Sequence, residues 1–80
     1  MTMKIKIGDF NRVKEFVEVV RDFGSDLFLK HGRYIIDAQS IMGILSLSFD
    51  KTLELEIIEK CAGEKYKLHS LMKEHGFLVE

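Results

Sequence analysis

The sequence predicts an α+β fold, an open-faced sandwich in which a four-stranded antiparallel sheet carries three helices on one face. The element order is βαββαβα. Four short segments alternate apolar and polar residues, a pattern typical of strands buried on one face. Three segments repeat apolar residues at helical spacing. Short connections and one-sided strands together favour an antiparallel sheet over a parallel one.

The first predicted strand covers residues 3–7, where apolar residues alternate with lysines, and Gly8 ends it. A helix follows, because Asp9 and Asn11 are residue types that accept backbone N–H bonds at a helix start. Its apolar stripe has the spacing i, i+3, i+4, i+7: Val13, Phe16, Val17 and Val20. We expect Gly24 to close this helix in the left-handed conformation.

Two further strands are predicted over residues 26–30 and 33–37, on either side of His31–Gly32. This dipeptide fits a two-residue hairpin loop, although histidine is weaker than asparagine or aspartate in its first position. The cross-strand pairs would be Leu29 with Tyr34 and Leu27 with Ile36, with Phe28 and Ile35 together on the opposite, open face. We interpret that apolar pair as screened by charged neighbours; the alternative is a homodimer or partner contact.

The second half of the chain predicts a short helix over residues 39–47, a strand over 52–58 and a helix over 62–74 that Gly76 ends. The strand alternates leucines and isoleucine with two glutamates, and the last helix has the stripe Leu68, Leu71, Met72 and His75. We place the first and last strands side by side, because the lysines of one then face the glutamates of the other. Each such pair contributes about 0.2–1 kcal/mol.

Composition restricts the classes of function. The formal net charge of −1 argues against a nucleic-acid-binding basic face and against a polybasic membrane patch. No apolar stretch approaches the ~18 residues that cross a bilayer, and the first residues lack the apolar core of a signal peptide. We therefore expect one cytoplasmic domain over residues 1–80, as a monomer or weak homodimer.

No pattern in the chain indicates catalysis or a cofactor. Cys61 is the only cysteine, so an internal disulfide or a site of several thiolates is not possible. His31, His69 and His75 have no zinc-site spacing, and no serine, cysteine or threonine has a base at a recognisable spacing. A glycine-rich phosphate loop is also missing. We expect a protein that is not an enzyme and uses no metal or cofactor.

The stretch AQSIMGILSL, residues 38–47, resembles the regulatory serine region of the HPr family, the small histidine phosphocarriers of the bacterial sugar phosphotransferase system. Ser40 matches the family's serine, and Ile41 and Met42 match the apolar pair that follows it. The stretch FVEVVRDFGSDL, residues 16–27, is similar to the family's first helix and second strand. Together with the element order, the resemblance covers essentially the whole chain and implies an HPr-like fold.

The sequence differs from the family at the residue that carries the family's phosphoryl group. The family has a phosphorylated histidine near the start of its first helix, in a Gly-x-His-x-Arg-Pro setting, whereas the loop here reads GDFNRVKEF. Counted back from Phe16, Asp9 falls at the histidine position and Asn11 at the arginine position. Measured from Gly8, Phe10 falls at the histidine position instead. Neither alignment supplies an imidazole, so we expect no phosphohistidine.

Ser40 has two compatible interpretations. As the N-cap of a short helix it contributes about 0.5–2 kcal/mol. By the resemblance, it is also a candidate for regulatory phosphorylation, which adds roughly −1.5 to −2 charges. That charge would stand beside a partner-binding surface formed by Ile41, Met42 and Leu45, because a helix this short cannot bury all its apolar residues. The alternative is that these residues only pack in the core.

The expected function is that of a non-enzymatic, HPr-like regulatory or interaction protein. The resemblance implies protein partners: a serine kinase, and a transcriptional or metabolic regulator that reads the Ser40 surface. Two alternatives remain open. One is a phosphocarrier that uses a non-histidine residue, and the other is a ferredoxin-like small-ligand-binding domain. The extra final helix and the missing glycine-rich loop count against the latter.

Overall fold

The computed structural model describes residues 1–79, and within them the elements follow the predicted order. They are β1 (Thr2–Ile5), α1 (Phe10–Val20), β2 (Asp26–His31), β3 (Tyr34–Asp37), α2 (Ile41–Leu45), β4 (Leu53–Ile58) and α3 (Glu64–Glu74). The sheet is antiparallel throughout, with strand order β1-β4-β2-β3. The predicted α+β open-faced sandwich is therefore confirmed.

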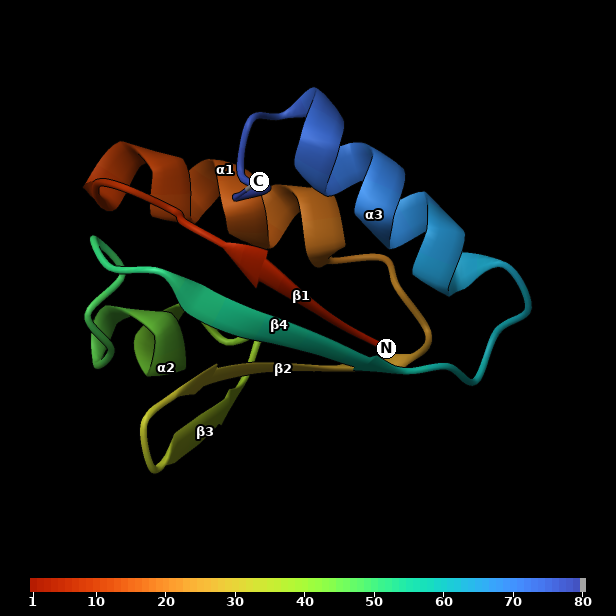
Figure 1. The fold of residues 1–80 in the computed structure, drawn as a ribbon, viewed down its shortest axis with the longest axis horizontal. Coiled ribbons are helices and arrows are strands. Elements are labelled where there is room, and N and C mark those ends of the chain that lie inside the picture. Colours follow the sequence, from red (N-terminus) through yellow and green to blue (C-terminus); the bar gives the residue numbers. More distant parts are fainter. Residues whose placement is uncertain (80) are drawn as a thin grey trace.

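Figure 1 shows α1 and α3 side by side over one face of the sheet. The short α2 contacts both α1 and β3. Its residue Ile44 is fully buried in the same core as Val13 and Phe16, so α2 covers the same face. The rest of this core comes from the inward residues of the strands and from Leu68 and Met72 of α3. None of the helices within residues 1–79 has the length and apolar character that a bilayer span requires.

The helix boundaries follow from local chemistry. Asp9 has extended backbone and its carboxylate accepts the N–H of Arg12 at 3.0 Å, so it is the N-cap of α1. Ser40 caps α2 in the same way, which makes that helix shorter than predicted. Gly63 is left-handed, with a φ of 85°, so α3 begins at Glu64 rather than at residue 62. Gly76, with a φ of 76°, ends α3 as expected.

The predicted hairpin register is wrong by two residues. Leu29 pairs with Ile36, and His31 pairs with Tyr34, so the loop is Gly32–Arg33. A loop of His31–Gly32 in a type I′ turn would need a positive φ at histidine, whereas glycine in first position matches type II′. Gly32 has a φ of 59°. Because the shift is an even number, every side chain keeps its predicted face. Phe28 and Ile35 share the open face but are not directly opposite.

The expectation for Gly24 is also wrong. It does not have a positive φ, and α1 ends at Val20. The carbonyl groups at the end of α1 and just after it are bound from another segment instead, because the side-chain amide of Gln39 donates to Val20 O at 2.9 Å and to Phe23 O at 3.1 Å. Glycine at 24 avoids a close contact, since a Cβ there would lie 2.6 Å from the Sγ of Cys61.

The charge argument placed β1 and β4 together correctly, and Lys4 lies opposite Glu54. Glu56, however, forms its ion pair with a different lysine. Lys30 of β2 reaches Glu56 with an N–O distance of 2.7 Å. The central strand β2 thus supplies the lysine, because Lys30 and Glu56 are diagonal neighbours across the β2–β4 pair.

Candidate functional site

The two regions that contain the predicted site residues, the start of α1 and α2, lie next to each other in the molecule. The N–H of Gly8, just before α1, donates to the carbonyl of Phe49, just after α2, at 2.9 Å. At the other end, Gln39 binds the last carbonyls of α1. The helices therefore run in opposite directions. Asp9 and Ser40 lie at opposite ends of this pair, so the structure does not bring them together.

The start of α1 presents a carboxylate and an exposed ring where the resemblance places the family's histidine. The carboxylate of Asp9 is occupied by its capping bond to Arg12. Phe10 is the first residue of α1 and is 50% exposed, with the Nζ of Lys14 at 5.2 Å from its ring centroid. Asn11 is exposed.

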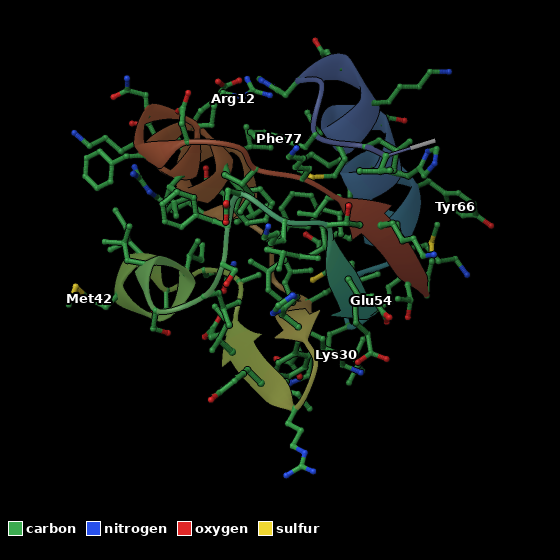
Figure 2. All side chains as sticks on the ribbon, turned by 60° about the vertical axis from the view of Figure 1, so that its left-hand side comes forward. Arg12, Lys30, Met42, Glu54, Tyr66 and Phe77 are labelled. Carbon is green, nitrogen blue, oxygen red and sulfur yellow. The ribbon has the colours of Figure 1, made fainter. Side chains whose placement is uncertain are left out.

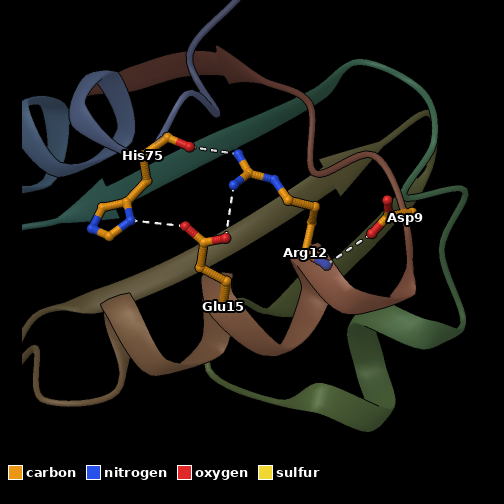
Figure 3. A network of polar contacts seen from close by, with 4 residues as sticks. All are labelled: Asp9, Arg12, Glu15 and His75. Atoms are coloured by element: carbon orange, nitrogen blue, oxygen red, sulfur yellow. Dashed lines mark hydrogen bonds and ion pairs between the residues drawn. The ribbon is translucent and has the colours of Figure 1, made fainter.

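A network of polar contacts fastens this end of α1 to the end of α3 (Figure 3). Arg12 Nη1 donates to Glu15 Oε1 at 2.7 Å, and Arg12 Nη2 donates to the carbonyl of His75. The ring of His75 places Nδ1 at 2.9 Å from Glu15 Oε2. A histidine from the far end of the chain thus lies against the first turns of α1.

Aromatic packing lies beneath this network. The guanidinium carbon of Arg12 lies 4.1 Å from the ring centroid of Phe77. Phe77 is buried and meets Phe16 edge to face, with ring centroids 5.5 Å apart. The ring of His75 is stacked on Phe77 at 6.4 Å. Arg12 and His75 are therefore held in place by the apolar core as well as by hydrogen bonds.

The electrostatics of the network favour an ionised Glu15. The hydrogen bond from His75, together with the charge and hydrogen bond of Arg12, lowers the pKa of Glu15 against the opposing effect of partial burial. An ionised carboxylate can only accept, so Nδ1 of His75 carries the proton of this bond. Nε2 of His75 has no hydrogen-bond partner within residues 1–79, and the side chain is 32% exposed. A neutral imidazole held this way directs its free electron pair away from Glu15.

The α2 surface contains the other predicted site residues. The hydroxyl of Ser40 accepts the N–H of Gly43 at 3.1 Å, which confirms its prediction as an N-cap. Ser40 itself is half-buried rather than sealed. Met42 is 74% exposed and Ile41 is 38% exposed. Figure 2 shows Met42 pointing away from the body of the molecule. Leu45 differs, because it is half-buried and packs against the core.

The remaining candidates do not form a site. In the part of the chain that the structure describes, no three His, Cys, Asp or Glu side chains are grouped as a metal ion would require. No pocket opens in the surface of that same part. Cys61 is exposed, and its Sγ lies close to Gly24, where a side chain on residue 24 would contact it.

Sequence reasoning missed Arg12, Glu15 and His75. The i, i+3 spacing of Arg12 and Glu15 on one helix was a visible signal for an ion pair, and the structure contains it. No local signal connects His75 to them, because Glu15 and His75 are separated by 60 residues. That contact depends on how α3 is docked against α1.

The family model described as the PTS HPr component phosphorylation site matches residues 11–73. Among solved structures, HPr-C-His from Thermoanaerobacter tengcongensis matches with a TM-score of 0.74 at 23% identity, covering 94% of this chain and 93% of that chain. A phosphocarrier protein HPr from Bacillus anthracis str. Ames matches with a TM-score of 0.70 at 20% identity, covering 85% of this chain and 89% of that chain. No curated protein sequence matches the chain significantly. The structural matches support the fold, and the family match covers most of the chain.

Proposed function

This chain belongs to the HPr family of the phosphotransferase system, and on that premise we propose that it is a regulatory interaction protein rather than a phosphohistidine carrier. One observation carries the proposal. The start of α1 has Asp9 as a capping carboxylate and Phe10 as an exposed ring, while α2 presents a half-buried serine beside exposed apolar side chains. The ferredoxin-like alternative falls away, because the chain is a member of a different family.

The proposed contact surface consists of Ile41 and Met42. Both side chains are exposed on α2, whereas Ile44 on the same helix is buried. Methionine is flexible and polarisable, so it adapts to partners of different shape. Family membership supports protein partners, and the partners proposed for this surface are a serine kinase that modifies Ser40 and a transcriptional or metabolic regulator that reads the modified surface. Leu45 contributes less than the other two, since it packs against the core.

Phosphorylation of Ser40 would act through charge. The hydroxyl stands at the start of α2, and its bond to the Gly43 N–H can be replaced by a bond from that N–H to a phosphate oxygen. The phosphate adds roughly −1.5 to −2 charges beside Ile41 and Met42. An apolar surface becomes an anionic one, which disfavours apolar partners and attracts arginine-rich ones. The fold is retained, because the cap is retained.

Intact-mass measurement of protein isolated from its own host tests this proposal. The wild-type protein is expected to carry one phosphate that Ser40→Ala lacks. Ser46→Ala is the matched control, because Ser46 ends the same helix and its exposed hydroxyl bonds the carbonyl of Gly43. Unmodified wild-type protein, or a phosphate that survives in Ser40→Ala, would contradict the switch.

A second candidate function, phosphoryl transfer, is favoured by one observation. His75 lies against α1 with Nδ1 bonded to Glu15 and Nε2 free of protein partners within residues 1–79. In such a transfer, Nε2 would attack the phosphorus of a phosphohistidine on a partner protein. The new N–P bond forms as the donor's N–P bond breaks, and its electron pair returns to the donor ring. It differs from the alternative that the sequence analysis left open, a phosphocarrier that uses a non-histidine residue.

Incubation with the phosphoenolpyruvate-dependent donor enzyme of the phosphotransferase system separates the two functions. The regulatory proposal expects no acid-labile phosphate on the protein. Acid-labile phosphate that is lost in His75→Gln and kept in His69→Gln would favour the carrier. His69 is the matched control, because it stands on α3, about 1.7 turns before the C-cap His75.

A further inference from the structure

The two edges of the sheet are treated differently by the rest of the chain. The edge formed by β1 is covered by the segment after α3. Lys6 N–H donates to Phe77 O at 2.8 Å, Val79 N–H donates to Lys4 O at 2.9 Å, and Ile5 bridges to Leu78. The edge formed by β3 has no such cover within residues 1–79, and Figure 1 shows β3 at the rim of the sheet, away from α1 and α3.

The backbone of β3 is available for pairing. Ala38 N–H donates to Leu27 O at 2.9 Å, so residues 38, 36 and 34 direct their hydrogen bonds toward β2. Alternation then turns the N–H and C=O of Ile35, and the N–H of Asp37, away from β2. The carbonyl of Asp37 already accepts the N–H of Ser40. Unpaired edge groups of this kind are a template for another strand.

The side chains along this edge form a row with a defined order. Ile35 and Asp37 alternate with Tyr34 and Ile36, so they lie on the open face of the sheet, and Arg33 precedes them in the hairpin loop. Ile35 is 61% exposed and Tyr34 is 69% exposed. The row is basic, apolar, acidic. In a second copy that runs antiparallel, the same row reads acidic, apolar, basic. Each charged residue of one copy then lies opposite a residue of the other sign, and Ile35 lies opposite Ile35.

From this complementarity we propose that β3 is a self-association edge, at which a second copy of this chain pairs antiparallel about a two-fold axis through Ile35. Ile35 then lies opposite the partner's Ile35, and Arg33 lies opposite the partner's Asp37. The same contact repeats across the axis, as an isologous interface requires. The backbone supplies two hydrogen bonds at the central pair and one from each Asp37 N–H to the carbonyl of the partner's Arg33.

The other face of the strand fits the same register. Tyr34 comes to lie opposite the partner's Ile36, and an aromatic residue beside a β-branched residue is a favourable cross-strand pair. The carboxylate of Asp37 uses Oδ1 to accept the N–H of Gln39 at 2.8 Å, which leaves Oδ2 for the guanidinium. The interface involves neither Ser40 nor His75, so it stands independently of both functions proposed above. A strand of four residues makes a small interface, and the dimer is therefore weak.

Charge reversal tests the register. Sedimentation equilibrium of the wild-type protein, from about 10 μM to about 1 mM, is expected to show a monomer–dimer equilibrium. Arg33→Asp makes the whole row acidic and Asp37→Arg makes it basic, so each variant alone is expected to dimerise at least about tenfold more weakly. An equimolar mixture of the two variants is expected to form a heterodimer, and the double variant is expected to dimerise like wild type.

The controls keep the test separate from misfolding. Lys73→Asp makes the same change of net charge as Arg33→Asp at an exposed position of α3, away from β3 (Figure 1), and is expected to leave the dimer unchanged. Circular dichroism of each variant checks the fold, and Asp37→Asn, which retains the acceptor for Gln39, checks the loss of charge alone. A wild type that stays monomeric, a dimer that survives Arg33→Asp, or a mixture that remains monomeric would each overturn the proposal.

Discussion

The ring of His75, at the end of α3, donates from Nδ1 to the carboxylate of Glu15, on the second turn of α1, across 2.9 Å. Arg12 closes the same link through the carbonyl of His75 and the other oxygen of Glu15. Arg12, Glu15 and His75 thus join the two long helices near the start of α1. The link has consequences for stability as well as for function.

Acid should destabilise the protein in part through this link. Hydrogen bonding from His75 lowers the pKa of Glu15, the hydrogen bond from Lys30 lowers that of Glu56, and the hydroxyl of Ser25 lowers that of Glu64. Each folded-state pKa lies below its unfolded value of about 4.3. The stabilisation is therefore present above that pH and is lost as the pH falls through the folded-state values. The thermal unfolding midpoint, measured at a series of pH values from neutral to about pH 2, should therefore decrease as the pH is lowered.

Glu15→Gln should reduce this loss, because the variant has no carboxylate to protonate at the link. Glu18→Gln, an exposed position on the same helix, is the matched control and should keep the wild-type acid dependence. Equal acid dependence in the two variants would show that the bond to His75 does not contribute.

Ser25→Ala should destabilise the protein by about 1–3 kcal/mol, since it removes a hydrogen-bond partner from the part-buried Lys60 N–H and from the charged carboxylate of Glu64. Ser25 is 3% exposed, and its hydroxyl accepts the N–H of Lys60 at 2.9 Å and donates to Glu64 Oε1 at 2.6 Å. Urea unfolding measures the change. Ser70→Ala, on the exposed side of α3, should stay within about 0.5 kcal/mol of wild type. If the Ser25→Ala variant is as stable as the control, the hydroxyl of Ser25 does not stabilise the fold.

Gly24→Ala should destabilise the wild-type background, and the sign should change when Cys61 is also replaced. The added Cβ would lie 2.6 Å from the Cys61 sulfur, so the exposed Cys61 side chain has to shift, at a cost below the ~1–3 kcal/mol of overpacking in a core. In a Cys61→Ala background the sulfur is gone. Gly24 does not have a positive φ, so alanine there should stabilise by about 0.4–1 kcal/mol. A double-mutant cycle in urea reports the coupling, and additive effects would contradict the contact.

Asp9→Ala should cost about 0.5–2 kcal/mol, because Asp9 is the N-cap of α1. Asp9→Asn should lose little, since the amide oxygen can accept the same N–H of Arg12. Chemical denaturation of the two variants makes the comparison. If both variants lose equal stability, the negative charge of Asp9, and not the capping bond, is what matters at this position.

Local patterns anticipated most of the architecture. The element order, the buried faces of the strands and the capping roles of Asp9 and Ser40 all follow from residues within a few positions of one another. The sequence also predicted that β1 and β4 are adjacent in the sheet, because the lysines of one strand and the glutamates of the other have opposite charges. Of the proposed site, the sequence contained Ser40, Ile41 and Met42 as one contiguous stretch.

Tertiary structure decided what depends on groups far apart in the chain. Gln39 takes over the end of α1, so Gly24 serves to make space rather than to end a helix. The docking of α3 brings His75 to Glu15, and Lys30 reaches Glu56 from the neighbouring strand. Periodicity and capping are properties of a few consecutive residues, so the sequence alone determined them. Pairings across 20 to 60 residues depend on which packing of the whole core is most favourable, and only the folded chain makes that selection.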